Sequence, residues 1–194
     1  MVLNQHLIVR INSAIVAAAY TITGDIPDPC SDMDSHTNML VLGKNCFIFD
    51  LVHVRTVDVA PFDPSLGLYK KIPIVDAAVA YNCLYNHKTY ILLARNALHV
   101  PSMYNSLIPP FIVRDSGSIV HDVPKIHVND PGVNDHLISF TDSGLQIQLQ
   151  LWGILSLFHS MVSTHEEITS CDKILINPDS ANWDPYLSYF ADNE

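Results

Sequence analysis

One stretch decides how the fold of this 194-residue chain is interpreted: Met33-Asp34-Ser35-His36-Thr37-Asn38-Met39-Leu40-Val41-Leu42-Gly43. An Asp-Ser pair stands shortly before the apolar run Leu40-Val41-Leu42, which predicts a short buried strand. The carboxylate of Asp34 is therefore expected in a tight loop that leads into this strand. The loop backbone must approach that carboxylate and donate N–H groups, which favours glycine two residues after the aspartate. Here that position holds His36.

The composition predicts a mostly β globule. Hydrophobic residues make up 48% of the chain and charged residues only 15%, which excludes a disordered chain. Twelve prolines against seven glycines, with many Val, Ile, Tyr and Thr, favour strands and turns over long helices. We expect a closed or folded-over sheet with about two short helices.

Several segments carry strand patterns. Residues 46–59, 71–81 and 88–100 are rich in β-branched and apolar side chains, and residues 82–88 predict a hairpin loop. Residues 136–153 predict two further strands around a tight turn.

Two short helices are expected from local signals. One lies within residues 100–117 and is broken by Pro109 and Pro110. The other begins after Thr164, because Glu167 stands three residues on, in the spacing of a capping box.

Charge and cysteine usage exclude several functions. The net charge is −10, and ten scattered Lys and Arg cannot form a phosphate-binding stripe, so no nucleic-acid partner is expected. Four scattered cysteines favour buried thiols and an intracellular, cytoplasmic protein. Near the N-terminus Leu7, Ile8 and Val9 precede Arg10, which inverts the order of a signal peptide, and the apolar part is too short to span a bilayer. No membrane partner is expected, and secretion is the alternative left open.

No metal or other cofactor is expected. The ten histidines include no His-x-His pair and no i, i+4 pair, the spacings that place two ligands on one face of a strand or helix. Trp152, Trp183, Tyr186, Tyr189 and Phe190 predict a strap of aromatic side chains that lies on the sheet.

Asp-Ser pairs at residues 34, 115 and 142 invite an aspartyl-protease interpretation, which needs two carboxylates that share one proton across a water molecule. Asp115-Ser116-Gly117 and Asp142-Ser143-Gly144 match best by pattern, but they are too close in sequence to belong to two separate lobes. We interpret the first as a helix C-cap and the second as a hairpin turn. Asp34-Ser35 has the better context, because an apolar strand follows it.

The chain resembles the retropepsin-like segment of copia-like retrotransposon polyproteins from algae and fungi. That family carries Asp-Ser-His-Ala-Asp-Thr followed by Gly-Lys-Asn, and this chain has residues 34–39 followed by Gly43-Lys44-Asn45. The resemblance covers residues 33–194, through the blocks RTVDVAPFDPSLG, IPIVDAAVAY, TYILLARNALHVP, NSLIPPFIVRDSGSIVHDVPK and CDKILINPDSANWDPYLSYFADNE.

The resemblance implies a fold and its boundaries. A retropepsin-like closed barrel is expected over residues 31–125, with a C-terminal β extension and aromatic tail over 126–194. Residues 1–30 are expected to be an N-terminal extension that packs on the domain.

The resemblance also implies an aspartic endopeptidase that acts on peptide substrates as a homodimer, because each chain supplies one aspartate. Asp34 of each copy would form the dyad, and Ser35 would hydrogen-bond the carboxylates from outside. The hairpin between about Lys71 and Lys88, or the turn PFDPSLG, would act as a flap over the substrate.

Two departures from the family leave an alternative open. The second aspartate of the family's loop is Asn38 here, and the family's Thr-Arg-x-Pro-Thr stretch reads Ser160-Met161-Val162-Ser163-Thr164. His36 stands where relatives also have histidine, and it could pair with the Asp34 carboxylate. The alternative is a catalytically silent fold that serves as an oligomerising or structural module, and a third, weaker interpretation is a barrel that binds a small ligand.

Overall fold

The computed structural model describes residues 8–11, 29–61 and 67–178, and the fold of these residues is mostly β. The two α-helices among them are short, α2 (Pro110–Asp115) and α3 (His165–Ser170), and η2 (Lys125–His127) is a turn of 3-10 helix. In chain order the strands are β1 (Ile8–Ile11), β2 (Cys30–Met33), β3 (Val41–Leu42), β4 (Phe47–Pro61), β5 (Tyr69–Asn82), β6 (Thr89–His99), β7 (Ser106–Ile108), β8 (Ile119–His121), β9 (Leu137–Ser139), β10 (Gln146–Gln148), β11 (Gln150–Trp152), β12 (Leu155–His159), β13 (Met161–Val162) and β14 (Asp172–Leu175).

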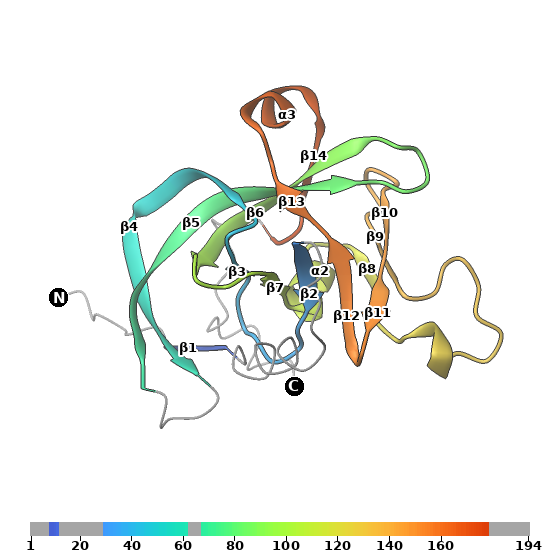
Figure 1. Cartoon of the computed structure of the whole chain (residues 1–194), viewed down its shortest axis with the longest axis horizontal. Coiled ribbons are helices and arrows are strands. Elements are labelled where there is room, and N and C mark those ends of the chain that lie inside the picture. The colour runs from blue at the N-terminus through green and yellow to red at the C-terminus, as the bar shows by residue number, and fades with distance from the viewer. Residues whose placement is uncertain (1–7, 12–28, 62–66, 179–194) are drawn as a thin grey trace.

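Most strands belong to one mixed sheet with the order β1-β4-β5-β6-β3-β7-β2-β12-β11 (Figure 1). β13 pairs with β5 and β14 with β6, and a second sheet has the order β10-β9-β8. The expected mostly β fold with short helices is thus confirmed. Among the described residues the end strands β1 and β11 do not pair with each other.

Two long hairpins form one side of the sheet, with β4 and β5 at the left of Figure 1. β5 pairs antiparallel with β4 and with β6, and the predicted loop between β5 and β6 closes through hydrogen bonds between Cys83 and Lys88 and between His87 and Cys83. β5 runs from Tyr69 to Asn82 and β6 begins at Thr89, so the predicted strand over residues 71–81 and the predicted loop over residues 82–88 are confirmed. The PFDPSLG turn joins β4 to β5, and its residues 62–66 lie outside the described residues.

The prolines begin a helix rather than break one. Pro109 is the N-cap of α2 and Pro110 its first residue, a position where the missing N–H costs no hydrogen bond. The expectation that Pro109 and Pro110 break a helix is therefore wrong. The residues before them form β7.

The C-terminal part of the described chain is built into the main sheet. β12 pairs antiparallel with β2, β13 antiparallel with β5, and β14 parallel with β6. Before β14, α3 begins as its sequence predicts: Thr164 Oγ1 accepts the Glu167 N–H, and the Glu167 carboxylate accepts the Thr164 N–H. Of the N-terminal extension, β1 pairs parallel with β4. The remaining residues of that extension and the aromatic tail from 179 onward lie outside the described residues.

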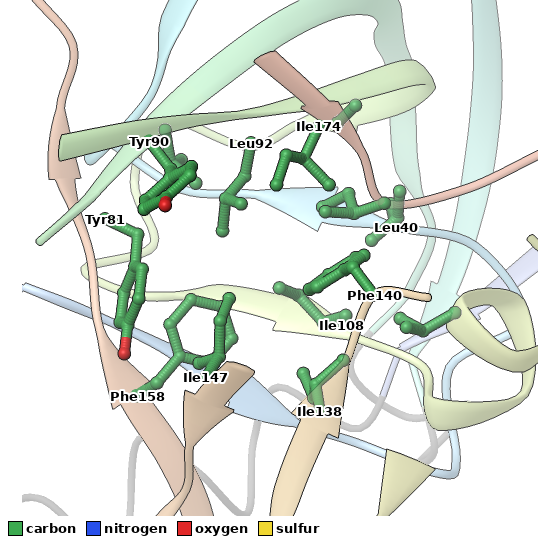
Figure 2. Close-up of a cluster of buried hydrophobic side chains, with 14 of the residues drawn as sticks. Leu40, Tyr81, Tyr90, Leu92, Ile108, Ile138, Phe140, Ile147, Phe158 and Ile174 are labelled. Carbon is green, nitrogen blue, oxygen red and sulfur yellow. The ribbon is translucent and has the colours of Figure 1, made fainter. Parts of the chain in front are cut away.

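One apolar core joins the two parts of the chain. Figure 2 shows Leu40 and Ile108 from the first part beside Phe140, Ile138 and Ile174 from the second. All five side chains are buried. Residues 126–178 therefore share a hydrophobic core with residues 31–125.

Gly43 marks the closest approach of two backbone segments. A Cβ atom on Gly43 would lie 2.4 Å from the Asn105 carbonyl oxygen and 2.8 Å from that of Met103. The next residue continues the contact, because the Lys44 N–H donates to the Met103 carbonyl at 2.9 Å. The glycine of the Gly-Lys-Asn motif is thus needed for close packing after β3.

Gly43→Ala is expected to lower the free energy of unfolding by about 3 kcal/mol, because neither backbone segment can move away without breaking hydrogen bonds. Denaturant titration measures the loss. Gly132→Ala is the matched control: its Cβ would meet nothing closer than Asp135 Oδ2 at 3.7 Å, so we expect a change within about 0.5 kcal/mol. Equal effects of the two substitutions would contradict this packing argument.

Candidate functional site

The sheet order places Asp34 at the end of three neighbouring strands. β7 lies between β2 and β3, parallel to β2 and antiparallel to β3. The loop from β2 to β3 must therefore cross the C-terminal end of β7. Asp34 is the first residue after β2, and its N–H donates to the Ile108 carbonyl, the last of β7, at 3.0 Å.

The loop holds the Asp34 carboxylate from its own backbone. The His36 N–H donates to Asp34 Oδ1 at 2.9 Å, and Thr37 Oγ1 donates to the Asp34 carbonyl at 3.1 Å. The loop backbone thus approaches the Asp34 carboxylate as the sequence predicts, although histidine stands where glycine was expected. His36 is not among the described residues with positive φ, so its side chain adds no backbone strain.

The other carboxylate oxygen of Asp34 is buried and unpaired. The side chain is 11% exposed, and Oδ2 is shielded from solvent and has no hydrogen-bond partner among the described residues. Leaving a buried carboxylate oxygen without a donor is costly. Asp34 thus has one oxygen oriented by the loop and one that requires a donor.

Ser35 and His36 do not form a Ser-His-Asp triad with Asp34. His36 Nδ1 lies 3.4 Å from Ser35 Oγ and 3.6 Å from Asp34 Oδ1. A triad needs the serine and the aspartate on different ring nitrogens, whereas both contacts here use Nδ1. The expected hydrogen bond from Ser35 to a pair of carboxylates stays a prediction, because it requires a second copy of the chain.

Of the other polar side chains near the loop, His36 borders the carboxylate and Lys44 does not. The His36 imidazole, 72% exposed, borders Asp34 from the solvent side. Lys44 lies elsewhere, with Nζ 3.8 Å from the centre of the Tyr104 ring. Asn38 is partly buried in the loop, and its bracing role stays a prediction.

A second buried carboxylate, which the sequence analysis missed, lies two residues before Asp34. Asp32 is 1% exposed, and its two oxygens accept hydrogen bonds from the Cys30 thiol (3.3 Å) and from Asn105 Nδ2 (3.2 Å). Alternation along β2 places Asp32 on the same strand face as Cys30, which is the one sequence signal for this contact. Asp32 has donors on both oxygens, and Asp34 has them on only one.

The two Asp-Ser-Gly sequences are turns, as their context predicts. Gly117 (φ +87°) follows the C-cap of α2, and Gly144 (φ +70°) lies in the turn between β9 and β10. The Gly117 N–H donates to the Arg114 carbonyl at 2.9 Å and the Gly144 N–H to that of Phe140 at 2.8 Å. Both turns line a shallow polar cavity of about 410 Å³ together with β14.

Within the described part of the chain, no three His, Cys, Asp or Glu side chains converge on a point that could hold a metal ion. No helix of that part is long and apolar enough to cross a membrane. The chain matches no protein-family model, no curated protein and no solved structure.

His136 is a buried histidine away from the Asp34 loop. It is 4% exposed, has a positive φ of 58°, and its Nε2 lies 2.8 Å from Ser156 Oγ. Burial lowers the pKa of His136, with a smaller contribution from Lys125, and Asp122 opposes the change.

The lowered pKa makes stability depend on pH. Below the ordinary pKa of 6.5, His136 is protonated in the unfolded chain but binds a proton less readily in the folded chain. The free energy of unfolding should therefore fall as pH drops below about 6.5, and His136 adds no pH dependence above that value.

His136→Asn, which tolerates positive φ, is expected to lessen the loss of stability between about pH 7.5 and pH 5.5. Denaturant titrations of both proteins at each pH measure the difference. The difference in stability at pH 7.5 gives the cost of losing the Ser156 contact, which is subtracted from the values at lower pH. The same pH-dependent loss in variant and wild type would show that His136 is not responsible.

Proposed function

We propose that this chain is an aspartic endopeptidase that acts as a homodimer, with one Asp34 from each copy forming the catalytic pair. The observation that carries the proposal is the buried, unpaired Oδ2 of a carboxylate whose Oδ1 is fixed by the loop backbone. In the proposed dimer the residues that shield Oδ2 move aside, and Asp34 of the second copy supplies the donor that Oδ2 lacks. Two such carboxylates that share one proton satisfy both inner oxygens through one hydrogen bond.

The shared proton defines the chemistry. Like charges this close do not both ionise, so one carboxylate is protonated while the other is charged. The charged carboxylate removes a proton from a water molecule, which attacks the peptide carbonyl, and the protonated carboxylate donates its proton to the substrate. The His36 N–H keeps each carboxylate in a fixed orientation during these transfers.

The arrangement of strands supports a retropepsin-like barrel as the finer description of the fold. Asp34 lies where the chain crosses from β2 to β3 over the end of β7, and a long hairpin of β4 and β5 follows directly. The flap over a bound peptide stays a proposal, and the β4–β5 and β5–β6 hairpins are its two candidates. An extended peptide is the substrate class that a strand-lined site accepts through backbone hydrogen bonds.

A silent oligomerising module is the second candidate. Large apolar side chains are exposed on the described residues, with Ile154 93%, Ile126 73% and Val133 73% exposed, and in this proposal another protein surface covers them. In this case Asp34 faces no partner carboxylate and no peptide is cleaved.

Asp34→Asn is expected to reduce cleavage of a mixed peptide library by at least roughly a thousand-fold, since it removes the charged base. Cleavage is measured between about pH 4 and pH 7, where carboxyl groups and imidazoles titrate. Asp142→Asn, a substitution in an exposed Asp-Ser-Gly turn, is the matched control and should keep full activity.

Dimer content of all three proteins is measured by sedimentation at the assay concentration. Activity that vanishes only in Asp34→Asn supports the protease. Folded, dimeric wild type without cleavage favours the silent module, and a monomeric wild type contradicts both forms of the proposal.

A further inference from the structure

Asn45 joins three parts of the chain around the Asp34 loop. Its side chain is 1% exposed, and Oδ1 accepts a hydrogen bond from Ser106 Oγ at 2.6 Å. Nδ2 donates to the Cys30 carbonyl at 3.1 Å and to Ser160 Oγ at 2.9 Å. Both amide donors are therefore used inside the protein, with partners in β2, in β7 and directly after β12.

Ser160 adds a second set of contacts to β2. Its Oγ lies 2.8 Å from Ser31 Oγ, and its N–H donates to the Pro29 carbonyl at 3.1 Å. β2 is thus held on one side by β7, in the register Ser31 to Ser106, and on the other by β12, in the register Ser31 to Phe158.

These contacts fix the strand that carries Asp34. Asp34 directly follows β2, and its N–H bonds to the last carbonyl of β7. A shift of β2 relative to β7 moves Asp34 with it. A catalytic carboxylate tolerates displacements of only about 0.5 Å, so this register matters for chemistry.

We propose that Asn45 and Ser160 are positioning residues for Asp34, and that residues 155–163 are part of the functional unit rather than an appendage to it. The claim that this positioning serves catalysis rests on the proposed function. The claim that Asn45 and Ser160 keep the Asp34 loop ordered does not depend on that function. Both side chains are fully buried, so they act through β2 and do not touch substrate.

The chain offers a matched pair of variants. Ser160 and Ser163 are both buried, at 1% and 2% exposure, and lie three residues apart. Ser163 Oγ has no hydrogen-bond partner among the described residues, whereas Ser160 Oγ contacts two side chains. Ser160→Ala and Ser163→Ala therefore remove the same atom, and only the first breaks the network.

Two measurements test the inference. Hydrogen exchange of the Asp34 amide should be about ten-fold faster in Ser160→Ala and unchanged in Ser163→Ala, since each buried hydrogen bond contributes modestly. The Ile176 amide, which donates to the Leu93 carbonyl at 3.0 Å, is the reference for global unfolding. In cleavage assays kcat should fall about ten-fold in Ser160→Ala while KM stays constant.

The outcomes separate the two hypotheses. Faster exchange at Asp34 but not at Ile176, found only in Ser160→Ala, supports positioning even if no peptide is cleaved. Equal changes at both amides, or equal effects of both serine variants, overturn it. If the wild type cleaves peptides and Ser160→Ala changes KM instead of kcat, positioning for catalysis is overturned while the proposed protease stands.

Discussion

The arrangement around Asp34 depends on the hydrogen bonds of one buried side-chain amide, that of Asn45. β2, β7 and the end of β12 are distant in sequence, and Asn45 bonds to all three. Gly43, two residues earlier, lets this segment approach the backbone of residues 103–105. The Gly-Lys-Asn motif is thus one packing device, in which the glycine permits contact and the asparagine fixes it.

A polar network at this place gives the sheet a unique register. Apolar side chains alone would tolerate sliding of short strands such as β2 and β7, because a three-residue pairing has few contacts to specify it. A buried amide and several hydroxyls leave unsatisfied donors in any other register, which is costly at low dielectric. Such a network therefore raises the free energy of any register that misplaces Asp34, even if the network adds little net stability to the native register.

Local features of this fold were predictable, and long-range ones were not. The capping box of Thr164 and Glu167, the β5–β6 hairpin and the Gly144 turn each depend on residues close in sequence. The insertion of β7 between β2 and β3 depends on pairings 66 to 75 residues apart, which no periodicity encodes. Asn45 was missed for the same reason, since it bonds to Cys30, Ser106 and Ser160. Asp32 has one local contact, with Cys30, but its other donor, Asn105, is 73 residues away.

The histidine at the glycine position does not by itself decide whether the site is active. The loop needs a backbone N–H two residues after Asp34, and every residue except proline supplies one. Glycine would be required only if φ were positive, and at His36 it is not. The substitution therefore preserves the geometry of the carboxylate and changes only what surrounds it, an exposed imidazole in place of open space. Under the proposed function, what separates a protease from a silent module is the partner of Asp34 Oδ2, which has none among the described residues.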